Sequence, residues 1–233
     1  MYFRLTSSPA TFQAMMNNLF RDMINKGDVA TFIDDVLVAT ETKKGHNEIV
    51  KEVLKQLEEN NLYVKPKKCV WKVKEISFLG VIMGPKGFRM EKKKVEKVTN
   101  WPTPQYVKDV QKFLGLANYY QRFVKDFAKI TKLLHQLVRK DEKWNWGREQ
   151  EEVFTQLKEI FTTEPVLAAP DLDKEMRVEA DALDYATGGV LLVKGEDRRW
   201  RPVAFISKLL NDTEKNYEIH DKEMLAVIRG LEV

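Results

Sequence analysis

The sequence predicts an α+β fold, with helices and short strands in successive segments. Apolar residues recur at helical spacing over several stretches, and short apolar runs of strand length separate them. Prolines that interrupt regular secondary structure divide the chain further, at Trp101-Pro102-Thr103-Pro104 and at Pro165 and Pro170. We therefore expect several small structural parts rather than one repeated unit.

The first part is expected to begin with a helix. Ser8 and Pro9 suit the start of that helix. Two short apolar runs then predict a tight β-hairpin. In order, the expected elements are a helix over 9–25, a hairpin with strands at 29–32 and 36–38, a helix over 45–61, and strands at 63–64, 70–71 and 76–83 around Gly80.

Helices dominate the middle of the chain, and strands return after the Pro165–Pro170 linker. The middle helices carry lysines and arginines around an apolar face. In order, the expected elements are helices over 107–124 and 130–138, a loop and amphipathic helix over 144–161, strands at 177–180, 187–193 and 202–207, and a helix from Asp221 to the end.

The charge of the chain is unevenly distributed. Residues 61–140 hold 19 Lys/Arg and 5 Asp/Glu, a net charge of +14, whereas the whole chain carries +4. A basic segment between acidic flanks is typical of contact with a polyanion such as nucleic acid. Ordinary solvated surface is the alternative interpretation.

Cysteine content and hydropathy set further limits. Cys69 is the single cysteine, which excludes an intramolecular disulfide framework and fits a reducing, intracellular compartment. No apolar stretch approaches the roughly 18 residues of a membrane span, and the chain does not open with a signal-peptide pattern. We therefore expect no membrane partner.

Asp34 and Asp35 are predicted at the turn of the first hairpin. Adjacent carboxylates repel each other unless they are paired or bound to a cation, and hard oxygen ligands suit Mg²⁺. Phosphoryl transfer often uses two metal ions about 3.5–4 Å apart. The alternative is that Asp-Asp is a common turn sequence.

A second pair of carboxylates lies near the C-terminus. Asp181 ends a predicted strand, and Glu223 lies in the first turns of the predicted last helix. One carboxylate at a strand end and one on a packing helix can converge across a sheet edge. The alternative is a surface aspartate and a helical glutamate without a joint role.

Other candidate groups give weaker evidence of a functional role. The histidines lack the spacing of zinc ligands. Some tryptophans could stack on bases, with anchoring of a helix junction as the alternative. The histidines are His46, His135 and His220, and the tryptophans are Trp101, Trp144 and Trp146.

Several segments, in order, resemble reverse transcriptases of gypsy-type (metavirus-like) LTR retrotransposon polyproteins. Phe32-Ile33-Asp34-Asp35 resembles the aromatic-x-Asp-Asp motif, and residues 3–13 resemble the segment beside the incoming nucleotide. Phe78-Leu79-Gly80 looks like the primer-grip hairpin, and Tyr106 to Val124 looks like the thumb. Residues 178–191 and 217–232 resemble the first hairpin and first helix of a retroelement RNase H.

The resemblance implies two activities. One is RNA-directed DNA polymerase (nucleotidyltransferase) activity, in which a primer 3′-hydroxyl attacks a deoxynucleoside triphosphate with two Mg²⁺ (or Mn²⁺) ions. The other is RNase H endonuclease activity on the RNA strand of an RNA–DNA hybrid. The implied partners are an RNA template, a DNA primer, their hybrid and deoxynucleoside triphosphates.

The resemblance also implies roles for individual residues. The catalytic and metal-binding residues would be Asp34, Asp35, Asp181 and Glu223. Phe3 and Arg4 would bind the nucleotide, although Arg4 replaces the family's usual glycine and Ser7 a common asparagine. The nucleic-acid-binding residues would be Leu79, Gly80, Lys108, Lys112, Arg122 and Lys125.

The expected organisation follows the family. It comprises a partial palm with the primer-grip hairpin (1–99), a helical thumb (100–140), a connection (141–174) and the N-terminal half of an RNase H-like α/β domain (175–233). Further family carboxylates would lie before Met1 and after Val233, so we expect the isolated chain to be inactive. The alternative is a non-catalytic, nucleic-acid-binding remnant of a retrotransposon polyprotein. We expect an intracellular location, in the cytoplasm (in a virus-like particle) or the nucleus.

Overall fold

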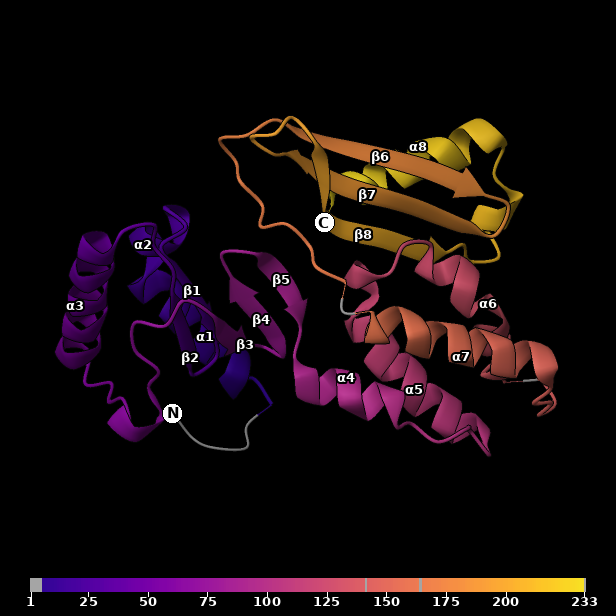
Figure 1. Ribbon diagram of the computed structural model, residues 1–233, viewed down its shortest axis with the longest axis horizontal. Coiled ribbons are helices and arrows are strands. Elements are labelled where there is room, and N and C mark those ends of the chain that lie inside the picture. The colour runs from indigo at the N-terminus through magenta and orange to yellow at the C-terminus, as the bar shows by residue number, and fades with distance from the viewer. Residues whose placement is uncertain (1–5, 141, 164, 233) are drawn as a thin grey trace. The chain divides into compact units, whose positions relative to one another are not determined.

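The computed structural model describes residues 6–140, 142–163 and 165–232. The chain divides into two compact units, Met1–Val73 and Lys74–Val233, and each is described by itself. Both contain helices and antiparallel strands, which confirms the expected mixture of helix and sheet (Figure 1). No described helix has both the length and the apolar character needed to cross a bilayer.

The first unit packs three helices around one hairpin. Phe20 interrupts the single helix predicted over 9–25, because its backbone leaves the helical region while its side chain is fully buried. Thr42 caps the last of these helices by accepting a hydrogen bond from the Gly45 amide at 3.1 Å. The elements are α1 (Ser8–Leu19), α2 (Arg21–Asn25), β1 (Val29–Phe32), β2 (Asp35–Val38) and α3 (Lys43–Glu59).

The strands predicted at 63–64 and 70–71 are wrong. The segment holds only a short 3-10 turn, η1 (Pro66–Lys68), and Tyr63 is 87% exposed. Pro66 has no backbone N–H to donate to a strand ladder, and three lysines surround it. The apolar side chains alone therefore did not determine a strand.

The second unit opens with a small antiparallel sheet and a helix. The sheet consists of β3 (Ile76–Phe78), β4 (Val81–Gly84) and β5 (Gly87–Met90), in that order. Residues 76–83 thus form two strands joined by the Leu79-Gly80 turn, with Phe78 paired to Val81. The sequence analysis did not foresee β5 or the lysine-rich helix α4 (Lys92–Thr99), in which only Val95 and Val98 are buried.

A layer of helices follows and confirms the helices predicted there (Figure 1). Its members are α5 (Val107–Tyr119), the 3-10 turn η2 (Gln121–Phe123), α6 (Phe127–Leu137) and α7 (Arg148–Thr162). One hydrophobic core joins α4 to α7, with the rings of Phe113 and Phe154 4.6 Å apart at its centre. This core crosses the expected boundaries at 99/100 and 140/141, and the domain limits stay a prediction.

The last part is a three-stranded antiparallel sheet with a helix on one face (Figure 1). Its elements are β6 (Met176–Leu183), β7 (Ala186–Lys194), β8 (Trp200–Leu209), the 3-10 turn η3 (Glu214–Asn216) and α8 (Ile219–Leu231). Buried Arg229 of α8 donates to Glu214 at 2.7 Å and to Thr187 at 3.0 Å. The pKa of Glu214 is lowered by the backbone N–H of Asn211 and by this arginine.

One peptide segment connects the two sheets of the second unit. Phe88 of β5 and Leu167 exchange backbone hydrogen bonds of 2.7 and 2.9 Å, and the Ala168 amide donates to Pro202 of β8 at 2.7 Å. At Gly87, φ is +106°, and an added Cβ would lie 2.0 Å from the Leu167 carbonyl oxygen. Only glycine fits there.

Candidate active site and nucleic-acid interface

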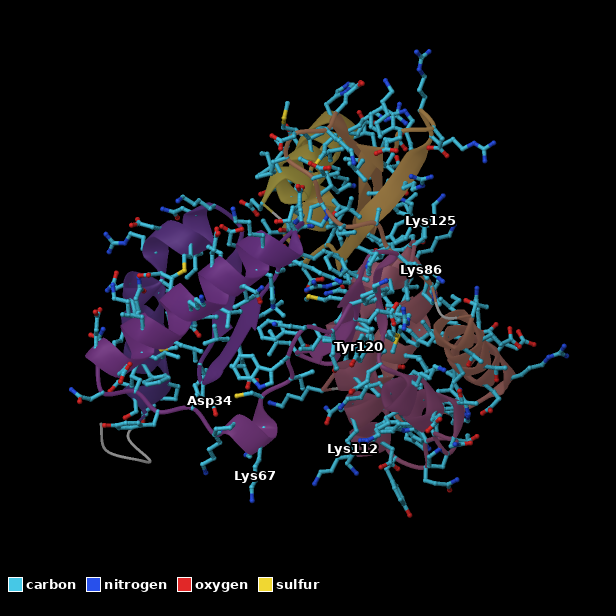
Figure 2. The ribbon with its side chains drawn as sticks, turned by 60° about the vertical axis from the view of Figure 1, so that its left-hand side comes forward. Asp34, Lys67, Lys86, Lys112, Tyr120 and Lys125 are labelled. Carbon is cyan, nitrogen blue, oxygen red and sulfur yellow. The ribbon has the colours of Figure 1, made fainter. Side chains whose placement is uncertain are left out.

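The β1–β2 hairpin carries the first pair of predicted site residues. Ile33 and Asp34 form its two-residue loop, and Asp35 is the first residue of β2, paired with Phe32 (Figure 2 labels Asp34). Asp35 therefore lies in the strand rather than in the turn. Ile33 has φ of +52°, which the first loop position of a type II′ turn requires but a β-branched side chain disfavours.

Gln13 of α1 holds this strained turn. Its Oε1 accepts a hydrogen bond from the Ile33 amide at 2.6 Å. Its Nε2 donates to the carbonyl and the hydroxyl of Thr31, at 3.2 and 3.1 Å, and to Asn17 Oδ1 at 2.7 Å. Gln13 is a candidate positioning residue that the sequence analysis did not single out. The sequence feature that could have identified Gln13 is a polar side chain on the face of the first helix that packs against the hairpin.

The two hairpin aspartates are free to accept a cation. Both are exposed, and neither makes a side-chain hydrogen bond or ion pair with the described residues. Adjacent carboxylates with open oxygens suit a hard divalent ion. No group of three or more potential ligands occurs in residues 6–140, 142–163 and 165–232. Phe3 and Arg4 lie outside these residues.

The Leu79-Gly80 turn of the second unit is fixed by two tyrosines at the end of α5. Both turn residues have positive φ, +50° and +73°, as a type I′ turn requires. The Tyr119 hydroxyl donates to the Leu79 carbonyl, and the Tyr120 hydroxyl donates to the Gly80 carbonyl at 3.0 Å. Burial raises the pKa of Tyr120 to about 12, so its phenol stays a donor at neutral pH.

The exposed face of α5 is basic and leads to this turn. Lys108, Lys112, Gly115 and Tyr119 are all exposed and are spaced four, three and four residues apart, which places them on one face of the helix. We call these four residues the α5 face. Lys112 donates to Asp109 at 3.2 Å and thereby lowers the pKa of that carboxyl. Because Tyr119 contacts Leu79, the last residue of the α5 face lies at the predicted turn, and Lys112 and Lys108 follow about 10 and 16 Å away along the helix.

Gly115 is a feature of this face that the sequence analysis missed. An alanine costs roughly 1 kcal/mol less than a glycine inside a helix. A Cβ added to Gly115 would meet no atom within 4 Å, so packing within the chain does not require glycine there. A glycine without a packing role is the signal that would have found it. Arg122 follows in η2 and is exposed.

Asp181 and Lys125 lie in a different place. Asp181 is two residues before the end of β6, not at its end as predicted. Side chains alternate along a strand, and Val178 lies against Gly230 of α8, so Asp181 points away from that helix. It lines a cleft of about 400 Å³ together with Lys125, Asp126, Lys129 and Glu179.

Glu223 is exposed on α8, on the opposite side of the β6–β7 layer from Asp181. The expected convergence of these two carboxylates is not seen among the described contacts. Neither side chain makes a hydrogen bond or an ion pair within the described part of the chain. Their joint role in catalysis stays a prediction.

Two segments of the chain match known protein families. Residues 3–83 match the family described as reverse transcriptase (RNA-dependent DNA polymerase). Residues 146–233 match the RNase H-like domain found in reverse transcriptase. The Tf2-3 and Tf2-7 transposon polyproteins of Schizosaccharomyces pombe (strain 972 / ATCC 24843) are 32% and 31% identical to the chain over 231 residues. These alignments cover 99% of the chain and 17% of each polyprotein.

Solved structures agree with this fold. The foamy viral protease-reverse transcriptase in complex with RNA/DNA hybrid has a TM-score of 0.82 and 24% identity, over 100% of this chain and 31% of that one. The dRH form in complex with ds DNA has a TM-score of 0.79 and 25% identity, over 97% of this chain and 39% of that one. The chain belongs to the reverse transcriptase–RNase H region of gypsy-type retrotransposon polyproteins.

Proposed function

We propose that this chain acts in reverse transcription, extending a DNA primer on an RNA template with deoxynucleoside triphosphates. The observation that carries the proposal is the β1–β2 hairpin, where two exposed and unpaired aspartates follow a strained residue clamped by Gln13. Strained backbone that the surroundings hold in place is common at catalytic sites. The hairpin also lies within the segment that matches the reverse transcriptase family.

Asp34 and Asp35 would hold divalent metal ions, Mg²⁺ or Mn²⁺, through their open oxygens. When bound, such ions stabilise the charge that develops on the attacking and leaving oxygens. Gln13 would keep the carboxylates in place, because it fixes the turn amide that precedes Asp34. Phe3 and Arg4 would lie beside the nucleotide, as the family segment implies.

The template–primer duplex would bind to the second unit. The Leu79-Gly80 turn and the α5 face would contact the duplex, with Arg122 extending the basic surface beyond α5. Lysines neutralise phosphates, and this contact is independent of sequence. Lys125 would contact the duplex separately, because it lines the cleft beside Asp181.

RNase H cleavage of the RNA strand is proposed from the family match of residues 146–233. Asp181 and Glu223 would be its carboxylates. The sheet between them argues against a single metal ion bound by both carboxylates in this arrangement. The division into palm, thumb, connection and RNase H-like parts, and an intracellular location, remain parts of the proposal.

Primer extension tests the polymerase proposal. The 233-residue chain is compared with its Asp34→Asn/Asp35→Asn variant on an RNA template, with Mg²⁺ and with Mn²⁺. Asp22→Asn/Asp173→Asn is a matched control, because it removes two exposed carboxylates outside the hairpin that also make no side-chain hydrogen bond or ion pair with the described residues. Product from the chain and the control, but not from the hairpin variant, supports the proposal. Product from all three refutes the assignment of Asp34 and Asp35.

A non-catalytic role in nucleic-acid binding is the second candidate, and the α5 face favours it. Absence of product from every variant, together with salt-dependent binding of a labelled RNA–DNA hybrid, would support binding without turnover. Absence of both would refute both candidates for the isolated chain.

A further inference from the structure

The Leu79-Gly80 turn depends on contacts outside its own sheet. Strands β3, β4 and β5 have only three to four residues each, and β3 pairs with β4 alone. Hairpins this short are marginal by themselves. Within the described residues, the turn carbonyls are held by Tyr119, by Tyr120 and by the Glu91 amide, which lies 3.4 Å from the Gly80 oxygen.

Tyr120 is the rigid member of this set. Its side chain is 1% exposed and belongs to the hydrophobic core of the helical layer, where its ring lies 6.3 Å from that of Phe123. Tyr119 is 54% exposed and has less packing around it. The core therefore fixes the position of the Tyr120 hydroxyl, and the hydroxyl fixes the Gly80 carbonyl.

The approach of the two segments is too close for a side chain at Gly80. A Cβ added at Gly80 would lie 2.8 Å from the Tyr120 hydroxyl oxygen. Glycine is thus needed at this position for two reasons: its φ is positive, and a buried phenol contacts it. Figure 2 places Tyr120 between the labelled Lys112 and Lys125 of the same unit.

We propose that Tyr120 is a positioning residue that sets the Leu79-Gly80 turn against the α5 face, so that turn and helix hold the duplex as one surface. The inference rests on the proposed function, because it needs that surface to bind nucleic acid. Tyr120 itself is buried and does not touch the duplex. Its effect passes through the backbone of the turn.

The test measures the affinity of a fluorescein-labelled RNA–DNA hybrid at several salt concentrations. Tyr120→Phe removes the hydroxyl and keeps the ring. Tyr106→Phe is the matched control, since the exposed Tyr106 hydroxyl has no partner among the described residues. Lys112→Gln reports on the phosphate contact. Hydrogen exchange of residues 79–81 is measured on every variant.

Tyr120→Phe is expected to weaken binding roughly 5-fold, the effect of one hydrogen bond, and to speed exchange of residues 79–81. Its salt slope should equal that of the native chain, because it removes no phosphate contact. Lys112→Gln should instead lower the slope of log affinity against log salt by about 0.9. Faster exchange confined to residues 79–81 separates a local loss of positioning from a general loss of stability, which would speed exchange throughout the helical layer.

Several results would overturn the inference. The inference is overturned if Tyr120→Phe binds the hybrid with native affinity, or if Tyr106→Phe weakens binding equally. In either case, a lower salt slope in Lys112→Gln would still support the proposed interface. No hybrid binding by the native chain would instead refute the proposed function. If Tyr120→Phe does not fold, the inference is tested on the native chain, by measuring which amides the bound hybrid protects from hydrogen exchange. Joint protection of residues 79–81 and 112–119 supports the inference, and protection of the helix alone refutes it.

Discussion

Replacing Gly80 by alanine should reveal how tightly the β3–β4 turn is coupled to α5. The substitution perturbs two things. Alanine at φ of +73° is strained by about 1–2 kcal/mol. Its Cβ would also lie 2.8 Å from the Tyr120 hydroxyl, which the core holds, so the hydrogen bond to the Gly80 carbonyl breaks. A buried hydroxyl left without a partner costs about 1–3 kcal/mol.

Gly80→Ala should therefore lower the free energy of unfolding by roughly 2–5 kcal/mol in the native background. In the Tyr120→Phe background no hydroxyl stands in the way, and only the backbone strain of about 1–2 kcal/mol remains. The two substitutions remove the same hydrogen bond. A double-mutant cycle should thus give a coupling energy of about 1–3 kcal/mol, the cost of the buried hydroxyl that is left without a partner.

The assay is urea unfolding followed by tryptophan fluorescence. Four of the five tryptophans, at positions 101, 144, 146 and 200, lie in the second unit, so the signal reports mainly on that unit. Equal m-values across the cycle would show that the same surface is exposed in each variant. Effects that add to within about 0.3–0.5 kcal/mol would refute the reasoning, because independent sites behave in that way.

Three further predictions concern other parts of the molecule. Gln13→Ala should speed amide exchange of the strained hairpin turn and destabilise the first unit by about 1–3 kcal/mol, since an unsatisfied turn amide remains. Gly115→Ala should stabilise α5 by roughly 1 kcal/mol and weaken hybrid binding, because a methyl group would stand between helix and duplex. Arg229→Met should destabilise the sheet of the second unit by about 3–5 kcal/mol, since Glu214 loses its buried partner. Because the folded pKa of Glu214 is depressed, its stabilisation is present above the ordinary glutamate pKa and is lost as pH falls through the folded value.

Each of these has an outcome that would contradict it. Unchanged exchange at residue 33 in Gln13→Ala would show that the clamp does not hold the turn. Native hybrid affinity in Gly115→Ala would remove that residue from the proposed interface. An acid limb of the unfolding curve that is the same in Arg229→Met and in the native chain would show that Glu214 does not couple to this arginine.

Local sequence patterns predicted most of the long elements. The apolar stripe of α5, the helical spacing of α7 and the alternation in β6 each dictate one element through its own residues. The exposed segment around Tyr63 failed because β-propensity matters only where a partner strand exists. Helix α4 was missed because its lysines outnumber its two buried valines.

Contacts between residues that are distant in the sequence could not be predicted from such local patterns. Tyr120 and Gly80 are 40 residues apart, and no periodicity links them. Similarly, Asp181 and Glu223 were expected to converge, but the facing of Asp181 depends on which side of the sheet α8 covers. The sequence motifs identified the candidate residues, whereas packing between distant elements decides which of them meet.

The peptide segment between β5 and β8 has a mechanical consequence. Leu167 is bonded to one sheet and Ala168, the next residue, to the other, with no slack between the two attachments. A displacement of either sheet within the second unit is therefore transmitted to the other through a single residue step. The strands that carry the proposed grip on the primer and those that carry Asp181 would travel together along a duplex, which keeps the spacing between the two sites constant from one step to the next.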